Sequence, residues 1–347
     1  MITESCNEGS MQNPLEQRAL GPCLASAIGL GCMNLSHAYG VPPQPAAAAH
    51  VLLRALDLGV THFDTAALYG FGSNEELVGR TLADRRSQYT LASKCGMQGV
   101  KFETGLRRVI DGRPETLRQT CEASLRRLRT DVIDLYYLHR WDKTVPVEES
   151  VGALAELKRQ GKIRAIGLSE VSAATLRRAY AVHPIAAVQS EYSLCTRNPE
   201  IAVLGTCREI GAAFVAFSPL ARGFLTGHMP GVAELTPTDI RRAMPRFSSV
   251  HHAANLELLT DYAALAKDAG CSMAQLALAW VLTRGPHVLA IPGTAHIAHL
   301  EENVAGGRVR LKEDVCTRLD ALINRGSIRG ARYNAATQAE IDTEDFA

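Results

Sequence analysis

Residues 55–82 read ALDLGVTHFDTAALYGFGSNEELVGRTL, and this stretch contains one complete strand-and-helix repeat. A helix stops at Gly59, a short strand covers 60–65, and a second helix covers 73–82. The strand ends at an acid, Asp64, and the loop that follows carries Tyr69 five residues later. The stretch raises two questions: which architecture repeats this unit, and why an acid stands at the end of a strand.

The same order of strand and helix recurs along the chain. Each expected strand is a largely continuous apolar run rather than an alternating one, which is typical of parallel strands covered by helices. The expected strands cover 26–33, 60–65, 89–96, 132–139, 163–169, 186–193, 212–219 and 287–294. Eight such units fit either a doubly wound sheet or an eight-fold barrel.

The first strand decides between these two folds. A doubly wound nucleotide-binding sheet would open with G-x-G-x-x-G. Residues 29–34 read GLGCMN, so the third glycine is missing, and a proline-rich loop follows. We therefore predict an α/β fold, a (β/α)8 TIM barrel over 17–326, with a flexible N-terminal tail over 1–16 and a C-terminal tail over 327–347.

The composition excludes several classes of protein. The 37 Lys and Arg residues nearly balance the 36 Asp and Glu residues, so no basic surplus supports nucleic-acid binding. No apolar run reaches the length of about 18 residues that a membrane helix needs, and the N-terminus does not read as a secretory signal. The nine cysteines form no C-x-x-C, and the histidines form no H-E-x-x-H. We expect reduced thiols, no metal site, no membrane association and a cytoplasmic location.

Polar residues follow the apolar runs at the carboxyl ends of the predicted strands, where such barrels carry their chemistry. They are Asp64, Lys94, His139, Ser169, Gln189, Ser218 and the pair Gly293–Thr294.

Four residues form a plausible catalytic set: Asp64, Tyr69, Lys94 and His139. Lys94 lies among small and apolar residues, so a buried ammonium there needs a partner, and Asp64 on the neighbouring strand is suitable. If Tyr69 reaches the same pocket, the ammonium should lower its pKa from about 10 and make it a general acid near neutral pH. His139 could orient a carbonyl oxygen. The set suits carbonyl reduction, in which negative charge develops on oxygen. An aldolase-type barrel with a Schiff base on Lys94 is the alternative.

Several motifs resemble the aldo-keto reductase family over about 17–326. They are GLGCMNLS (29–36), FDTAALYGFGSNEELVGRTL (63–82), ASKCG (92–96), DLYYLHRWD (134–142), GKIRAIGLSE (161–170), VQSEYS (188–193), FSPLARGFLTG (217–227) and IPGTAHIAHLEENV (291–304). The GLSE run resembles one bacterial branch. The resemblance implies a (β/α)8 barrel that reduces aldehydes or ketones with a nicotinamide cofactor, usually NADPH, without metal. It makes Tyr69 the proton donor, Lys94 its ion-paired partner with Asp64, and His139 the residue that orients the substrate carbonyl.

The resemblance also implies the cofactor contacts. They are Gly31, Cys32, Met33 and Asp64 beside the nicotinamide, Ser169 and Gln189 at its carboxamide, Phe217 stacked on its ring, Ser218, Leu220, Arg222 and Gly223 at the pyrophosphate, and Glu302 and Asn303 at the adenine.

The sequence departs from the family pattern at two places. Thr294, His296 and His299 stand where Lys or Arg usually bind the 2′-phosphate, so we expect NADPH to be preferred only weakly and NADH to be accepted. Glu170 replaces a common asparagine. Residues 241–248, RRAMPRFS, resemble a loop of the same bacterial branch, and they are either a solvated basic loop or part of the substrate site.

The substrate is expected to be a small carbonyl compound bound by Met33, Tyr69, His139 and Trp141. Sugar-derived ketones, quinone-like carbonyls and aromatic aldehydes all fit such a pocket, and the oligomeric state stays open. The rival function within the same fold is a cofactor-binding regulatory subunit of low activity.

Overall fold

Eight strands form one parallel sheet that closes on itself. The computed structural model describes residues 14–36, 38–103 and 105–346. The strand order is β12-β11-β10-β9-β8-β5-β4-β3. The strands are β3 (Leu30–Gly31), β4 (His62–Asp64), β5 (Thr90–Cys95), β8 (Ile133–Leu138), β9 (Ile163–Ser169), β10 (Ala187–Glu191), β11 (Ala213–Phe217) and β12 (Val288–Ile291). Ile28 and Ala290 form a parallel bridge between the two edges. The predicted barrel is therefore confirmed, and the doubly wound alternative is wrong.

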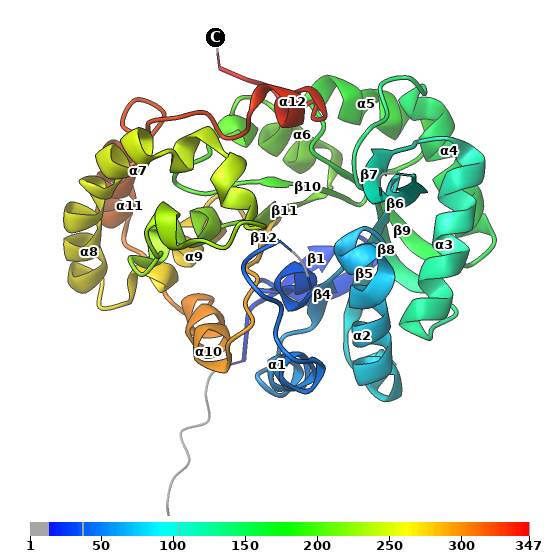
Figure 1. The fold of residues 1–347 in the computed structure, drawn as a ribbon, viewed down its shortest axis with the longest axis horizontal. Helices are drawn as coiled ribbons and strands as arrows, with labels where there is room; N and C mark the ends of the chain where they lie inside the picture. Colours follow the sequence, from blue (N-terminus) through cyan, green and yellow to red (C-terminus); the bar gives the residue numbers. More distant parts are fainter. Residues whose placement is uncertain (1–13, 37, 104, 347) are drawn as a thin grey trace, which may run out of the picture.

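Helices surround this sheet on its outer side (Figure 1). They are α1 (Pro45–Asp57), α2 (Ser73–Leu82), α3 (Pro114–Leu128), α4 (Val147–Arg159), α5 (Ala173–Val182), α6 (Val203–Ile210), α7 (Ser249–Leu256), α8 (Leu258–Asp268), α9 (Met273–Leu282), α10 (Ile297–Gly306), α11 (Glu313–Leu322) and α12 (Ala335–Ala339). Within the described residues, none of these helices has the length and apolar character that a membrane span would require.

An N-terminal hairpin closes one end of the barrel. Strands β1 (Gln17–Leu20) and β2 (Cys23–Ser26) pair antiparallel. Leu20 and Ala25 of this hairpin are buried in the same apolar cluster as Leu135 and Val215 of the barrel strands. Because the amino end is filled in this way, the opposite, carboxyl end is the one that can hold a ligand.

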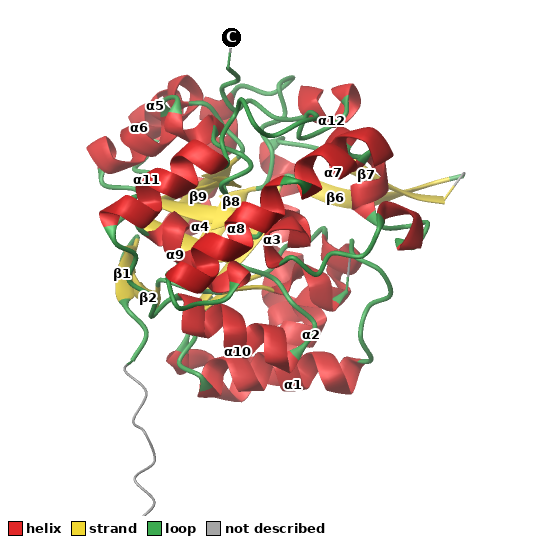
Figure 2. Cartoon of the chain, turned by 90° about the vertical axis from the view of Figure 1, so that its left-hand side faces the viewer, coloured by secondary structure: helices red, strands yellow, loops and turns green. Residues whose placement is uncertain are grey.

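The structure has a second hairpin, and the sequence analysis predicted neither of the two. Strands β6 (Met97–Phe102) and β7 (Gly105–Ile110) pair antiparallel between β5 and α3. This hairpin projects from the side of the molecule opposite to β1 and β2 (Figure 2). Its outer half is exposed.

The residues after the predicted barrel boundary, expected as a C-terminal tail, pack on the barrel. Arg332 forms ion pairs with the buried carboxylates of Glu170 and Glu191. The carboxylate of Asp342 accepts hydrogen bonds from the backbone N–H and the hydroxyl of Ser172, over 3.1 and 2.9 Å. Residues 1–13 of the predicted N-terminal tail lie outside the described part of the chain.

The barrel interior gives a first test of the fold. An added Cβ at Gly167 of β9 would lie 2.3 Å from the ring of the buried Tyr137, so we expect Gly167→Ala to lower the free energy of unfolding by about 1–3 kcal/mol. Gly152 is the matched control, because it is exposed on α4 with nothing within 4 Å of an added Cβ. Gly152→Ala should raise stability by about 0.5–1 kcal/mol. Urea unfolding measures both, and a Gly167→Ala protein as stable as the wild type would contradict this packing.

Candidate active site

A cavity of about 770 Å³ opens at the carboxyl end of the barrel. It is lined by strand ends, by the β6–β7 hairpin, by the long segment after β11 and by the C-terminal segment. The site residues from the sequence analysis that line it are Gly31, Met33, Asp64, Tyr69, His139, Ser169, Gln189, Phe217, Ser218, Leu220, Arg222, Gly223, Thr294, His296, His299, Glu302 and Asn303.

Lys94 does not line this cavity itself; it is completely buried behind Asp64 and Tyr69, which do. Because β4 and β5 are neighbours, its ammonium reaches the carboxylate of Asp64, with which it forms an ion pair. The ammonium also donates to the carbonyl oxygen of Thr65 over 2.9 Å and to the hydroxyl of Tyr69 over 3.3 Å. The second oxygen of Asp64 accepts a hydrogen bond from the amide of Gln189 over 2.8 Å. Both buried charges thus have the partners that burial requires.

Tyr69 and His139 lie above this ion pair. Tyr69 begins a short 3-10 turn directly after the β4 loop, and its backbone N–H donates to the carbonyl of Ala66 over 3.0 Å. The rings of Tyr69 and His139 meet edge to face with their centroids 5.8 Å apart. The two side chains that the sequence analysis assigned to one carbonyl oxygen are therefore adjacent.

The structure corrects one part of the sequence-based argument. We expected Lys94 to bring the pKa of Tyr69 below its ordinary value near 10. Burial raises the pKa of Tyr69, and the lowering by the positive charge of Lys94 does not overcome this effect, so the net shift is upward. The Tyr69 hydroxyl is therefore protonated at neutral pH, as a proton donor must be. Burial acts to lower the pKa of Lys94, but Asp64 and Tyr69 outweigh it and the net shift is upward.

The loop after β11 has an unusual backbone. Ser218, Ala221 and Arg222 have φ angles of 49°, 48° and 59°, which are left-handed values that non-glycine residues rarely adopt. The guanidinium of Arg222 donates to Glu191 over 2.6 Å. It also bonds the hydroxyls of Tyr39 and Tyr333, over 2.9 and 3.1 Å, which come from opposite ends of the chain. Strained backbone of this kind is common at ligand-binding sites.

The amino end of α10 also faces the cavity. The hydroxyl of Thr294 accepts a hydrogen bond from the backbone N–H of His296 over 3.1 Å. His296 precedes the helix, and its side chain makes no capping hydrogen bond. The rings of His296 and His299 are exposed, line the cavity and lie 5.2 Å apart. A helix amino end with two histidines is suited to an anionic group.

Besides Lys94, two predicted site residues, Cys32 and Trp141, do not line the cavity. The Cys32 thiol is buried in the layer between sheet and helices, and it donates to the carbonyl of Leu30 over 3.6 Å. The Trp141 indole donates to the carbonyl of Val145 over 2.8 Å, and Arg178 of α5 stacks on it at 5.4 Å. Both residues lie just after the end of a strand. Their side chains do not line the cavity, whereas those of the nearby Met33 and His139 do. Contacts of these two residues with a nicotinamide or a substrate stay predictions.

Other residues line the cavity without having been predicted. They include Tyr39, Arg108, Arg140 and Tyr333. Arg241 and Met244 line it as well, so the segment 241–248 is not simply a solvated loop. Glu170 does not line it, because its carboxylate is turned to Arg332. Loops that meet only in the folded barrel give no periodic signal in the sequence. For this reason Tyr39, Arg108, Arg140 and Tyr333 were not among the predicted site residues.

The fold and the site together define a (β/α)8 barrel with a buried lysine–aspartate pair beneath a tyrosine and a histidine. The model of the Aldo/keto reductase family matches residues 27–324. The chain belongs to this family.

Individual relatives agree with this assignment. "Probable aldo-keto reductase 1" of Glycine max is 43% identical over 310 residues, which are 89% of this chain and 88% of the relative. "Aldo-keto reductase yakc [NADP(+)]" of Schizosaccharomyces pombe is 40% identical over 329 residues, 93% of this chain and 96% of the relative. The structure of the glycerol dehydrogenase AKR11B4 from Gluconobacter oxydans superimposes with a TM-score of 0.80 and 31% identity, covering 89% of this chain and 95% of that one.

The buried ion pair predicts a large effect on stability. Lys94→Met keeps the apolar stem and removes the ammonium, so Asp64 loses its buried counter-charge. We expect the free energy of unfolding to fall by about 3–5 kcal/mol. The control is Arg159→Met, which breaks the exposed 2.7 Å pair with Glu156 and should leave the unfolding midpoint unchanged. Equal midpoints for Lys94→Met and the wild type in urea would show that the pair is not structurally important.

Proposed function

We propose that this protein is an NADPH-dependent oxidoreductase that reduces an aldehyde or ketone to an alcohol, reversibly, with the proton supplied by Tyr69. The observation that carries the proposal is the hydrogen-bonded group at the cavity floor, in which the Lys94 ammonium bridges the Asp64 carboxylate and the Tyr69 hydroxyl.

The residues present fit a nicotinamide dinucleotide. Ser169 and Gln189 lie at the deep end of the cavity near Asp64, and Phe217 presents an aromatic ring at the end of β11. The strained loop after Phe217 and the amino end of α10 offer backbone N–H groups to phosphates. The fission yeast relative is named for NADP(+), which supports the same cofactor here.

A bound reduced nicotinamide supplies the hydride. The side chains of this chain perform the other tasks. His139 donates to the carbonyl oxygen and orients it, and Tyr69 protonates that oxygen as negative charge develops. Lys94 lies against the phenol and stabilises the tyrosinate left by proton transfer, while Asp64 and the carbonyl of Thr65 hold the ammonium in place.

The proposal also covers the direction of the reaction and the location of the protein in the cell. The Gluconobacter neighbour is named a glycerol dehydrogenase, which supports a reaction that also runs from alcohol to carbonyl. The eight cysteines in the described ranges are free thiols, which supports the proposed cytoplasmic location.

The two rivals are less well supported. A Schiff base needs an accessible amine, but Lys94 is fully buried and its ammonium contacts three oxygen atoms. A regulatory subunit would not need a proton donor, yet Tyr69 and His139 are adjacent in this cavity.

Removal of the Tyr69 hydroxyl tests the proposed reaction. Tyr69→Phe keeps the ring packing, and we expect kcat for a reducible aldehyde to fall by roughly two to four orders of magnitude while the Kd for NADPH is unchanged. Loss of NADPH absorbance measures turnover, and cofactor fluorescence measures binding. Tyr180→Phe, an exposed position on α5, is the control. Near-normal kcat in Tyr69→Phe would refute the assignment.

The two cavity histidines predict a weak cofactor preference. Arginine offers a 2′-phosphate a permanently charged fork of donors, and histidine does not. We expect the NADPH-to-NADH ratio of kcat/KM to be small in the wild type. His296→Arg should raise this ratio, because arginine stays charged.

The control for this prediction is His183→Arg, a half-buried histidine at the end of α5 that does not line the cavity. It should leave the ratio unchanged. A large ratio in the wild type would mean that other groups bind the 2′-phosphate.

A further inference from the structure

Four arginines line the cavity at the carboxyl end, and three of them are neutralised by carboxylates of this chain. The pairs are Arg108 with Glu340 at 2.6 Å, Arg222 with Glu191 at 2.6 Å and Arg241 with Asp239 at 2.7 Å. These three guanidiniums hold loops together around the cavity.

Arg140 differs from the other three. Its Nη1 donates to the carbonyl oxygen of His139 over 2.7 Å and to the hydroxyl of Ser169 over 3.1 Å. Within residues 14–36, 38–103 and 105–346, no carboxylate lies within ion-pair distance of this guanidinium, and Nε and Nη2 make no hydrogen bond. A half-buried guanidinium with two unused donor positions is a site for an acceptor that the protein itself does not supply.

The position of Arg140 places this charge beside the reacting groups. Arg140 directly follows His139, and its contact to Ser169 spans the neighbouring strand ends of β8 and β9. Its charge also acts on the phenol: burial raises the pKa of Tyr69, and the positive charges of Lys94 and Arg140 both oppose that rise. The free donors of Arg140 are therefore close to the carbonyl that Tyr69 and His139 would bind.

The cofactor does not account for this charge. The loop over 218–223 follows β11, which is separated from β8 by β9 and β10, and α10 follows β12 on the far side of the barrel. Phosphates at those places are distant from Arg140. The nicotinamide carboxamide expected at Ser169 is neutral and does not need a cation.

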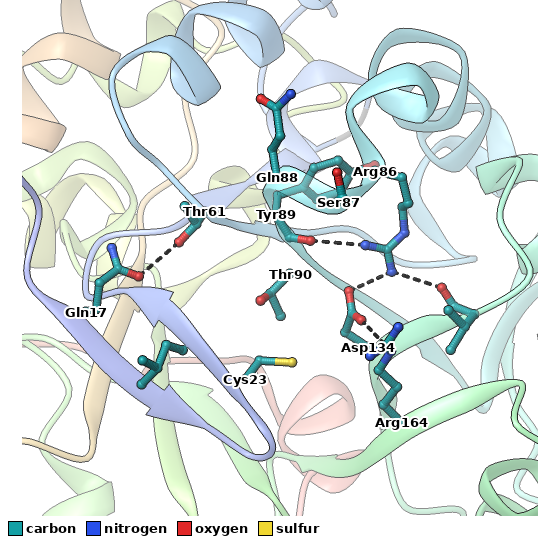
Figure 3. A pocket seen from close by; sticks show the side chains of 12 residues that line it. Gln17, Cys23, Thr61, Arg86, Ser87, Gln88, Tyr89, Thr90, Asp134 and Arg164 are labelled. Carbon is teal, nitrogen blue, oxygen red and sulfur yellow. Dashed lines mark hydrogen bonds and ion pairs between the residues drawn. The ribbon is translucent and has the colours of Figure 1, made fainter.

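A second cavity of about 590 Å³, next to the β1–β2 hairpin, offers no comparable group. Its two arginines, Arg86 and Arg164, both pair with Asp134, at 2.6 and 3.1 Å (Figure 3). Arg86 also donates to three further oxygens of the protein, so little donor capacity is left for a ligand.

We propose that Arg140 binds a carboxylate on the carbon next to the reacting carbonyl, so that the substrates are 2-oxo acids and the products 2-hydroxy acids. This inference rests on the proposed reductase function. Nε and Nη2 can receive the carboxylate in the fork geometry that arginine offers. In the reaction the hydride adds to the carbonyl carbon, the proton of Tyr69 goes to its oxygen, and the carboxylate is unchanged.

The test uses phenylglyoxylate and its neutral methyl ester, which share the reacting carbonyl and differ in the charge next to it. We expect the wild type to prefer the acid. In Arg140→Met the acid-to-ester ratio of kcat/KM should fall by about 10- to 100-fold, the loss typical of a hydrogen bond to a charged group. Arg140→Lys should keep part of the preference. The control is Arg159→Met, which removes an exposed cation of α4 that pairs with Glu156 and does not line the cavity, and should leave the ratio unchanged.

Each outcome has one meaning. A fall of the ratio in Arg140→Met, with the Kd for NADPH unchanged, supports the proposal. An unchanged acid-to-ester ratio overturns the proposal. If acid and ester turnover fall equally and NADPH binding weakens as well, Arg140 is a positioning residue for Ser169. If the wild type turned over neither compound nor a panel of neutral aldehydes, the reductase function itself would fail. Circular dichroism and turnover of the ester show that Arg140→Met is folded, and Arg140→Gln repeats the test if it is not.

Discussion

The whole site depends on one buried charge, the ammonium of Lys94. An isolated ammonium inside a barrel is prohibitively unstable, so it must be surrounded by oxygen atoms at fixed places. The parallel neighbours β4 and β5 supply this arrangement, because they place Asp64 and the carbonyl of Thr65 beside Lys94. The ammonium also donates to the Tyr69 hydroxyl. The interaction that makes the lysine tolerable therefore also fixes the orientation of the proposed proton donor.

The sequence predicted the barrel, and it predicted that Asp64, Tyr69, Lys94 and His139 would lie together, because both follow from the order of strands and polar residues along the chain. Continuous apolar runs identified the eight strands, and each polar residue after such a run was placed at the same end of the sheet. It could not predict which way a side chain turns at the end of a strand. Cys32 and Trp141 were predicted as site residues, but their side chains do not line the cavity, whereas those of Met33 and His139 do.

The sequence also gave the wrong direction for the pKa of Tyr69. The neighbour that lowers it, Lys94, was recognisable from residue types and strand order. The burial that raises it comes in part from Met97 and Ile110 of the unpredicted β6–β7 hairpin, which pack in the same cluster as Tyr69. Burial is a property of the complete fold, so its contribution was invisible until the loops were placed.

The central claim is that Tyr69 is a neutral phenol held against a permanent ammonium, and an ultraviolet titration tests it directly. The tyrosinate absorbance near 295 nm of the wild type, minus that of Tyr69→Phe, reports the ionisation of this one side chain. Because burial outweighs Lys94, we predict no difference signal below the ordinary tyrosine pKa near 10. A tyrosinate signal that develops between pH 7 and 9 would contradict the account, since the ammonium would then dominate over burial.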